Sequence, residues 1–279
     1  MQAEAQEDQA TLWNGSAGRA WVDGQDLLDQ LFAPFEELLV EGAVAQSARD
    51  VLDIGCGTGS TTVAIARALG NGARCTGVDI SAPMIEAAHA RADREGVGAD
   101  FIVADAESHD LEARRFDRIV SRFGVMFFAD PVAAFANLRG GAHAAAALDL
   151  IVWRSAGDNP FMTTAERAAA PLLPCLPARD PNAPGQFGFA DPDRVRAILG
   201  AGGWRDIVIR PLDVGCVMPE TELAGYFTRL GPLGRVIDQV DASARERIVE
   251  TVRAAFEAYV LKGEVRFTAA CWRIEACAA

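Results

Sequence analysis

The sequence has little of what metal, redox or nucleic-acid chemistry requires. It holds three histidines, and its six cysteines form no CxxC pair, so no metal-ligand spacing is present and reduced thiols are expected. Its 26 basic residues are outnumbered by 39 acidic ones, for a formal net charge of −13 at pH 7. Because nucleic-acid binding depends on Lys and Arg that neutralise phosphates, this balance argues against a DNA or RNA partner.

Long apolar runs are also missing. No stretch reaches the roughly 18 to 20 uncharged residues that a membrane-spanning helix needs, so no membrane span is expected. The first ten residues, MQAEAQEDQA, carry acids where a secretory signal would carry basic residues before an apolar run. We therefore expect a cytoplasmic protein, and half of its residues are apolar, which is enough for a sizeable core.

Hydrophobic patterning predicts an α/β fold. Residues 11–45 repeat leucine and phenylalanine at steps of three and four, which is typical of an amphipathic helix. After residue 50, short β-rich runs alternate with amphipathic stretches, and this alternation indicates parallel strands joined by right-handed helical crossovers. The expected strands are residues 51–54, 74–80, 101–104, 117–121, 148–153, 207–210 and 265–274. The prediction is a doubly wound, mostly parallel seven-stranded sheet.

The sequence pattern divides the chain into five parts. A Pro-rich stretch at 155–190 is expected to be a long loop that acts as a lid or substrate segment after the fifth strand. A helix should then begin at Asp191-Pro192, with Asp191 as its N-cap. The parts are a disordered tail (1–10), an N-terminal helical cover (11–45), a ligand-binding core (46–154), the lid segment (155–190) and the rest of the sheet with a helical insertion (191–279).

The most informative segment is VLDIGCGTG at residues 51–59. An apolar strand is followed by three glycines at alternate positions that open a helix, and glycine is needed where the backbone turns sharply and a ligand approaches it closely. The dinucleotide fingerprint G-x-G-x-x-G/A, counted from Gly55, requires Gly or Ala at position 60, where this chain has Ser60. The spacing thus favours a ligand other than NAD.

Three acids accompany this turn. Asp53 lies inside the first strand, and Asp79 and Asp105 end the second and third strands. Asp79 follows Gly59 by 20 residues, where an acid accepts hydrogen bonds from ribose hydroxyls. Because the carboxyl ends of parallel strands meet at one crevice, the three acids should meet there too and favour a cationic ligand.

These motifs, together with GVDIS at 77–81, ADAE at 104–107 and FDRIVSRFGVMFFADP at 116–131, resemble the class I S-adenosylmethionine-dependent methyltransferases. More narrowly, the chain is similar to the ubiquinone and menaquinone biosynthesis methyltransferases. The resemblance covers about residues 50–154 and implies a Rossmann-like domain, with S-adenosyl-L-methionine as cofactor and a small molecule as methyl acceptor.

The resemblance also assigns cofactor contacts. It places the three glycines under the methionine part, Asp53 near its ammonium, Asp79 on the ribose diol, Ile80 and Met84 on the adenine, Asp105 and the Ala106 amide at the adenine edge, and Ser121 beside the sulfonium. The implied cofactor-binding set is Asp53, Gly55, Cys56, Gly57, Gly59, Asp79, Ile80, Met84, Asp105, Ala106, Glu107 and Ser121.

One segment departs from that family. Relatives commonly carry an Arg-Pro-Gly-Gly turn before the fifth strand, whereas this chain has His143 followed by an alanine run at 144–147. Alanine is a strong helix former, so the preceding helix is expected to continue into this run.

The sequence identifies residues that bind the methyl acceptor less specifically than it identifies those that bind the cofactor. Candidates for substrate binding are Trp13, Trp21, Arg122, Phe123, Met126, Trp153 and Phe161, and each is equally interpreted as core packing. His109, His143 and Arg122 are candidates for a catalytic role, with the histidines as general bases. No metal site is expected.

The predicted function is direct in-line methyl transfer to a small, apolar or aromatic molecule, with the cover and lid segment excluding water. Two alternatives stay open: an NAD(P)-dependent oxidoreductase, which Ser60 and the absence of a Tyr-x-x-x-Lys pair disfavour, and a non-catalytic cofactor-binding protein of the same fold. The sequence leaves open the acceptor, the atom methylated and the oligomeric state.

Overall fold

A computed structural model describes residues 8–113, 115–173 and 183–278. Its centre is one sheet in the order β3-β2-β1-β4-β5-β8-β6, with the two-residue strand β7 (Val260–Leu261) paired to β8. The strands are β1 Asp50–Ile54, β2 Arg74–Asp79, β3 Asp100–Val103, β4 Phe116–Arg122, β5 Ala142–Trp153, β6 Trp204–Pro219 and β8 Glu264–Ala278. Strands β1 to β5 pair in parallel, and β8 is antiparallel to β5 and β6. The mostly parallel α/β fold is confirmed.

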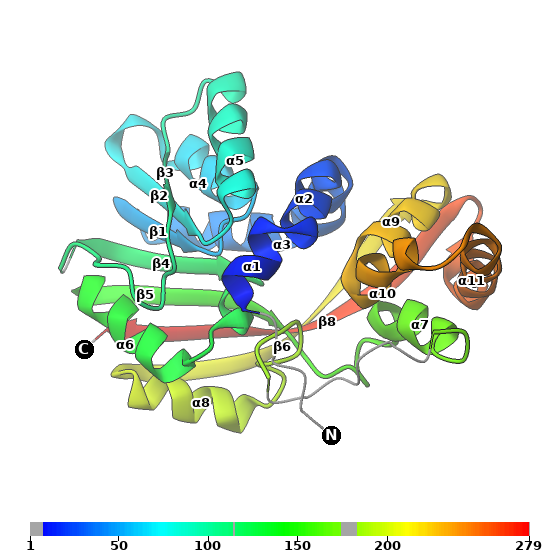
Figure 1. Cartoon of the computed structure of the whole chain (residues 1–279). Helices are drawn as coiled ribbons and strands as arrows, with labels where there is room; N and C mark the ends of the chain where they lie inside the picture. The colour runs from blue at the N-terminus through cyan, green and yellow to red at the C-terminus, as the bar shows by residue number, and fades with distance from the viewer. Residues whose placement is uncertain (1–7, 114, 174–182, 279) are drawn as a thin grey trace.

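Helices cover both faces of this sheet (Figure 1). The strand order reverses direction at β1, so right-handed crossovers put α4 (Ser60–Leu69) and α5 (Ala82–Glu95) on one face and α6 (Pro131–Gly141) on the other. Helix α8 (Pro192–Ala201) packs beside α6. As predicted, α8 begins at Asp191, whose side chain accepts hydrogen bonds from the backbone N–H groups of Asp193 and Arg194.

The N-terminal cover comprises α1 (Gln9–Asn14), α2 (Ser16–Asp23) and α3 (Gln25–Ala45). Helix α3 packs on α4 and the sheet, and α2 packs on α5. Helix α1 begins inside the segment expected to be a tail, of which residues 1–7 lie outside the described part. Figure 1 shows α1 and α2, in blue, standing between α5 and a second group of helices.

That second group, the helical cluster, comprises α7 (Pro160–Ala169), α9 (Leu223–Arg229), α10 (Gly231–Val236) and α11 (Ala242–Ala255). It is built on the ends of β6 and β8 that extend beyond the rest of the sheet (Figure 1). Its interior is aromatic: Phe161 stacks on Phe267 at 3.8 Å between ring centroids and contacts the rings of Phe256 and Tyr259.

Two local predictions are wrong. Helix α6 ends at Gly141 and the alanine run belongs to β5, because Ala142 and Ala147 pair with β4 and Ala146 is fully buried. Sheet pairing outweighs the helix propensity of alanine, which is worth less than about 1 kcal/mol per residue. Within 155–190, residues 160–169 form α7 rather than loop, because Pro160 occupies its first turn and Phe161 is buried in the helical cluster. Residues 174–182 lie outside the described part.

Candidate functional site

The glycine turn between β1 and α4 has the close geometry that the sequence suggested. Gly55, Gly57 and Gly59 adopt φ angles of 63°, 56° and 81°, in the left-handed region. A Cβ on Gly55 would lie 2.6 Å from the Cα of Gly124, and one on Gly59 would lie 2.8 Å from the Cβ of Ala88. The turn therefore cannot accept side chains at 55 or 59 without moving its neighbours.

Asp79 fastens this turn to the end of β2. One carboxylate oxygen accepts the Gly57 N–H at 2.8 Å and the other accepts the Ser81 N–H at 2.9 Å. Burial raises the pKa of Asp79, while the amides of Ser81, Gly57 and Ile80 oppose that rise. The carboxylate is thus oriented by the backbone, with lone pairs left for a ligand hydroxyl.

Asp53 lies beneath the turn and is 1% exposed. Its Oδ2 accepts a hydrogen bond from Thr62 Oγ1 at 2.6 Å. Burial raises the pKa of Asp53 to about 7; the Thr62 hydrogen bond and the charge of Arg122 lower it, and the charges of Asp79 and Glu36 raise it. This carboxyl therefore changes charge near neutral pH.

The segment after β3 is tied to α6. Asp105 is exposed and its Oδ1 accepts the Glu107 N–H at 2.9 Å. The Glu107 carboxylate accepts the N–H groups of Ala129 and Asp130, at 2.9 and 3.1 Å, and the Ala106 carbonyl accepts from Asn137 at 3.1 Å. Glu107 thus positions the turn that leads into α6, and Asp105 is left facing solvent.

Ser121 is fully buried at the end of β4. Its hydroxyl donates to the Ile54 carbonyl at 2.7 Å and accepts the Gly124 N–H at 3.1 Å. Both hydrogen bonds hold the β4 end against the glycine turn. In this arrangement Ser121 shapes the site through Ile54 and Gly124.

A small cavity lies between the glycine turn and the cover. Its volume is about 40 Å³, enough for a few water molecules at the roughly 10–15 Å³ that each requires. It brings together the cover, the turn and the end of β4. The lining residues are Trp21, Gln25, Leu28, Asp29, Phe32, Asp53, Gly55, Cys56, Gly57, Thr58, Thr61, Arg122 and Phe123.

Two sets of hydrogen bonds hold the cover over this cavity. Asn14 donates to the Ile80 carbonyl at 3.0 Å and accepts the Ala82 N–H at 2.9 Å, and Ser81 Oγ donates to the Trp13 carbonyl at 2.6 Å. On the other side, Arg91 of α5 is bonded to the Thr58 carbonyl at 2.9 Å and to the carboxylate of Asp29 and the amide of Gln25, at 2.6 and 3.2 Å. The sequence prediction missed Asn14, Arg91 and Asp29 because only tertiary packing brings them to the site.

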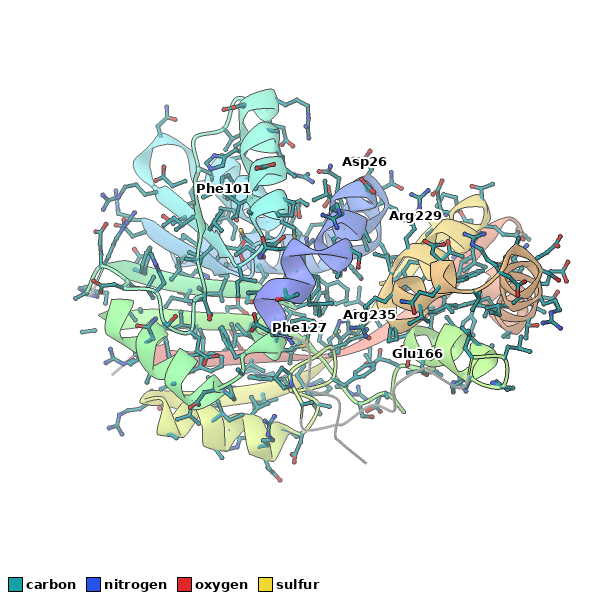
Figure 2. All side chains as sticks on the ribbon, in the orientation of Figure 1. Asp26, Phe101, Phe127, Glu166, Arg229 and Arg235 are labelled. Carbon is teal, nitrogen blue, oxygen red and sulfur yellow. The ribbon has the colours of Figure 1, made fainter. Side chains whose placement is uncertain are left out.

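The predicted acceptor-binding candidates with apolar side chains fall into three places. Trp13 contacts Trp21 and Phe127 edge-on, with centroid distances of 6.1 and 5.1 Å, and Figure 2 shows Phe127 beside α1. Phe123 stacks on Trp153 at 4.6 Å, and the N–H of Trp153 bonds to the sulfur of Met126 at 3.4 Å. Phe161 is in the helical cluster and does not line the cavity.

The histidine candidates do not gather at the cavity. His143 is exposed at the start of β5, the opposite end of a parallel strand from the crevice, and its Nδ1 accepts the Ala145 N–H at 3.3 Å. His109 follows β3 and its carbonyl accepts from Asn137 at 2.8 Å. Of the three catalytic candidates, Arg122 alone lines the cavity.

The described ranges contain neither a candidate metal centre nor a candidate membrane span. Within 8–113, 115–173 and 183–278, no group of three or more His, Cys, Asp or Glu side chains is arranged to hold a metal ion. In the same part of the chain, no helix is both long and apolar enough to cross a bilayer.

Comparison with known proteins identifies the core. Residues 51–140 match the methyltransferase domain family. Aklanonic acid methyltransferase DauC of Streptomyces sp. (strain C5) is 34% identical over 109 residues, 39% of this chain and 50% of that protein. Nocamycin O-methyltransferase of Saccharothrix syringae is 29% identical over 102 residues, 36% of each chain. The chain spans about half or less of the length of these curated relatives.

A solved structure supports the fold. A protein described for the conversion of a disulfide bond into a thioacetal group during echinomycin biosynthesis superimposes with a TM-score of 0.56 and 21% identity, over 86% of this chain and 80% of that one. This likeness supports the Rossmann-like fold, and within that fold residues 51–140 are similar to the methyltransferase domain family. The narrower likeness to the ubiquinone and menaquinone enzymes stays a prediction.

Proposed function

We propose that this protein transfers the methyl group of S-adenosyl-L-methionine to a small molecule. The observation that carries the proposal is the joint placement of the glycine turn, the oriented carboxylate of Asp79 and the buried carboxyl of Asp53 beneath one cover. The turn leaves no room for side chains at Gly55 and Gly59, and the two acids suit an ammonium and a ribose diol. These residues fit the cofactor.

The cofactor supplies a methyl group on a positively charged sulfur, so no covalent nucleophile from the protein is needed. The residues of this chain then have three tasks: to hold the donor, to orient the acceptor and to exclude water. We assign the first task to Asp53, Asp79 and the glycine turn, with Ile80, Met84, Asp105 and Ala106 around the adenine. The cover and the segment 155–190 serve the third.

The acceptor is proposed to be apolar or aromatic. Trp13, Trp21 and Phe127 meet edge-on at the rim of the cover, and Phe123 and Trp153 stack below it. Two relatives are named as methyltransferases of aklanonic acid and of nocamycin, which agrees with a small-molecule acceptor and does not favour an oxidoreductase. The net charge of −13 further supports an acceptor that is not a nucleic acid.

The test is calorimetric titration of the wild type and Asp79→Ala with S-adenosylmethionine and S-adenosylhomocysteine, with NADH as the control ligand. We expect micromolar binding of both sulfur ligands, weakened about tenfold or more by the substitution because charge-assisted hydrogen bonds to the ribose are lost. A folded wild type that binds neither sulfur ligand, or that binds NADH instead, would overturn the proposal.

A further inference from the structure

The first turn of α4 carries a buried hydroxyl that makes no hydrogen bond to the described residues. Thr61 is 2% exposed, and its Oγ1 has no hydrogen-bond partner among the described residues. Thr61 also lines the cavity over the glycine turn. The next residue, Thr62, is by contrast bonded to Asp53. Unpartnered buried hydroxyls are costly and uncommon, so this one calls for a ligand.

Arg122 faces the same cavity with donors to spare. Its guanidinium bonds to Ser60 Oγ at 2.7 Å and to the Phe32 carbonyl at 3.5 Å, and it lies 3.8 Å from the carboxylate of Glu36. A guanidinium has five N–H donors in a planar fork that matches a carboxylate. Among the described residues that line the cavity, Arg122 is the one cation, beside the acids Asp29 and Asp53.

The methionine part of the cofactor carries an ammonium and a carboxylate on one carbon. The cavity offers both complements: a buried carboxyl at Asp53, and a guanidinium and an unpartnered hydroxyl at Arg122 and Thr61, next to the N-terminus of a ten-residue helix. Asp53 and Arg122 are close enough to affect one another electrostatically.

We propose that Arg122 and Thr61 bind the carboxylate of the cofactor's methionine part, while Asp53 takes its ammonium. Arg122 is then a cofactor-binding residue and neither a general catalyst nor an acceptor contact. This inference rests on the proposed function and deepens it by assigning the amino-acid end of the cofactor to named side chains.

The test compares two ligands that differ at that end. S-adenosylhomocysteine has the amino-acid group, and 5′-methylthioadenosine keeps the nucleoside and sulfur without it. Arg122→Met should weaken S-adenosylhomocysteine roughly 10- to 100-fold and leave methylthioadenosine within twofold, because the lost contacts are charge-assisted hydrogen bonds to the carboxylate. Arg122→Lys should recover part of the loss, since a lysine keeps the charge and loses the fork.

Thr61 supplies a second, independent variant. Thr61→Val removes only the hydroxyl, so it should weaken S-adenosylhomocysteine several-fold and leave methylthioadenosine unchanged, whereas Thr61→Ser should bind both like the wild type. The free Thr61→Val protein should melt at the same temperature as the wild type or about 2 °C higher, because the hydroxyl has no partner there. Arg210→Gln, an exposed arginine on β6 paired with Glu275, is the matched control and should change neither affinity.

The outcomes separate the hypotheses. If wild type binds S-adenosylhomocysteine and Arg122→Met weakens both ligands equally or neither, the carboxylate assignment is wrong while the proposed function stands. If Thr61→Val lowers the melting temperature and leaves affinity unchanged, Thr61 is structural and the assignment is again wrong. Failure of the wild type to bind either ligand overturns the proposed function itself.

Discussion

A buried carboxyl that titrates near neutrality gives cofactor binding a pH dependence. Asp53 has a pKa of about 7 chiefly because of burial, and only its ionised form can pair with an ammonium. We expect the affinity for S-adenosylhomocysteine to rise between pH 6 and 8, by up to tenfold per pH unit below pH 7. Titration calorimetry at several pH values measures this slope.

The control for that slope is Asp53→Asn, which removes the ionisable carboxyl of Asp53 and leaves the ligand and the neighbouring side chains Arg122, Asp79 and Glu36 unchanged. Its affinity should be lower and its slope between pH 6 and 7 should be flat. Equal slopes in wild type and variant would mean that another group takes up the proton.

The same shift predicts the pH dependence of stability without cofactor. The folded state holds the Asp53 proton more tightly than the unfolded state, whose pKa is near 3.8, so the stabilising contribution is complete below pH 4 and is lost as pH rises to about 7. Relative to Asp53→Asn, the wild type should lose about 1.4 kcal/mol of unfolding free energy per pH unit in that window. Urea unfolding at pH 4.5, 5.5 and 6.5 tests this; a difference that grows more favourable with pH would have the wrong sign.

The sequence revealed some site residues and not others for a physical reason. Gly55, Gly59 and Asp79 belong to one strand-turn-helix unit and its neighbour, so their spacing along the chain already reflects their contacts. Thr61 occupies an ordinary position in an amphipathic helix, and its unpartnered hydroxyl exists only in the packed structure. Arg122 was visible as a candidate, but its place in one cavity with Asp53 and Thr61 was not.

At the level of elements, we expect the cover to move when the proposed cofactor binds. A cavity of about 40 Å³ is small beside a nucleoside with an amino-acid tail, and Asn14 fastens α1 across the end of β2 with two hydrogen bonds. Asn14→Ala should therefore speed S-adenosylhomocysteine dissociation roughly 3- to 10-fold, with about 1 kcal/mol or less lost in stability. Stopped-flow fluorescence of the cover tryptophans Trp13 and Trp21 would measure this dissociation rate.

The comparison for this prediction is Asn71→Ala, an exposed asparagine in a turn away from the cover. It should leave the dissociation rate unchanged. An Asn14→Ala rate equal to that of the wild type would show that the cover opens elsewhere, for example at the contacts of Arg91.

The junction between the sheet and α7 depends on one side-chain amide. Asn159 is 1% exposed and bonds to both the N–H and the carbonyl of Ala270 in β8, each at 2.9 Å, as a neighbouring strand would. Asn159→Ala leaves the Ala270 N–H without its partner, while the Ala270 carbonyl keeps the Arg154 N–H at 3.0 Å, and should cost about 1–3 kcal/mol of unfolding free energy. Urea unfolding measures this, with Asn71→Ala expected within about 0.5 kcal/mol of wild type; a comparably small Asn159 effect would mean that water replaces the amide.

Helices and strands whose ends depend on local sequence were predicted better than those whose ends depend on contacts with distant parts of the chain. The start of α8 was predicted because an Asp-Pro cap acts within one turn. The boundary at Ala142 was missed because the alanine run becomes a strand only through pairing with β4, and α7 was missed because its apolar face packs against residues about 100 positions later. Such contacts leave no local pattern in the chain.

On the scale of the whole molecule, the core and the helical cluster share one interior. The contiguous set of buried apolar residues runs from Leu31 in the cover through Trp153 in β5 to Phe227 and Phe256 in the cluster. Strands β6 and β8 are long enough to belong to both parts. A shared interior of this kind predicts that both parts unfold together.

The aromatic residues provide separate reporters for the two parts. The five tryptophans (13, 21, 153, 204 and 272) lie in the cover and sheet, whereas Tyr226 and Tyr259 both contact Phe161 in the cluster. Phe161→Ala should cost about 3–5 kcal/mol, since it removes a buried ring stacked on Phe267. We expect the melting temperature of this variant to fall by the same number of degrees whether it is measured by tryptophan fluorescence or by the ¹⁹F resonances of fluorotyrosine.

Ligand binding gives a second test of whether the two parts unfold together. A ligand that binds only the native state raises the stability of every part that unfolds with its site. Binding of S-adenosylhomocysteine at the proposed site should thus raise the tyrosine-reported melting temperature of the cluster by the same amount as the tryptophan-reported one. A cluster that melts at an unchanged temperature while the tryptophan signal shifts would contradict the shared interior, and would indicate a helical cluster able to open without release of the cofactor.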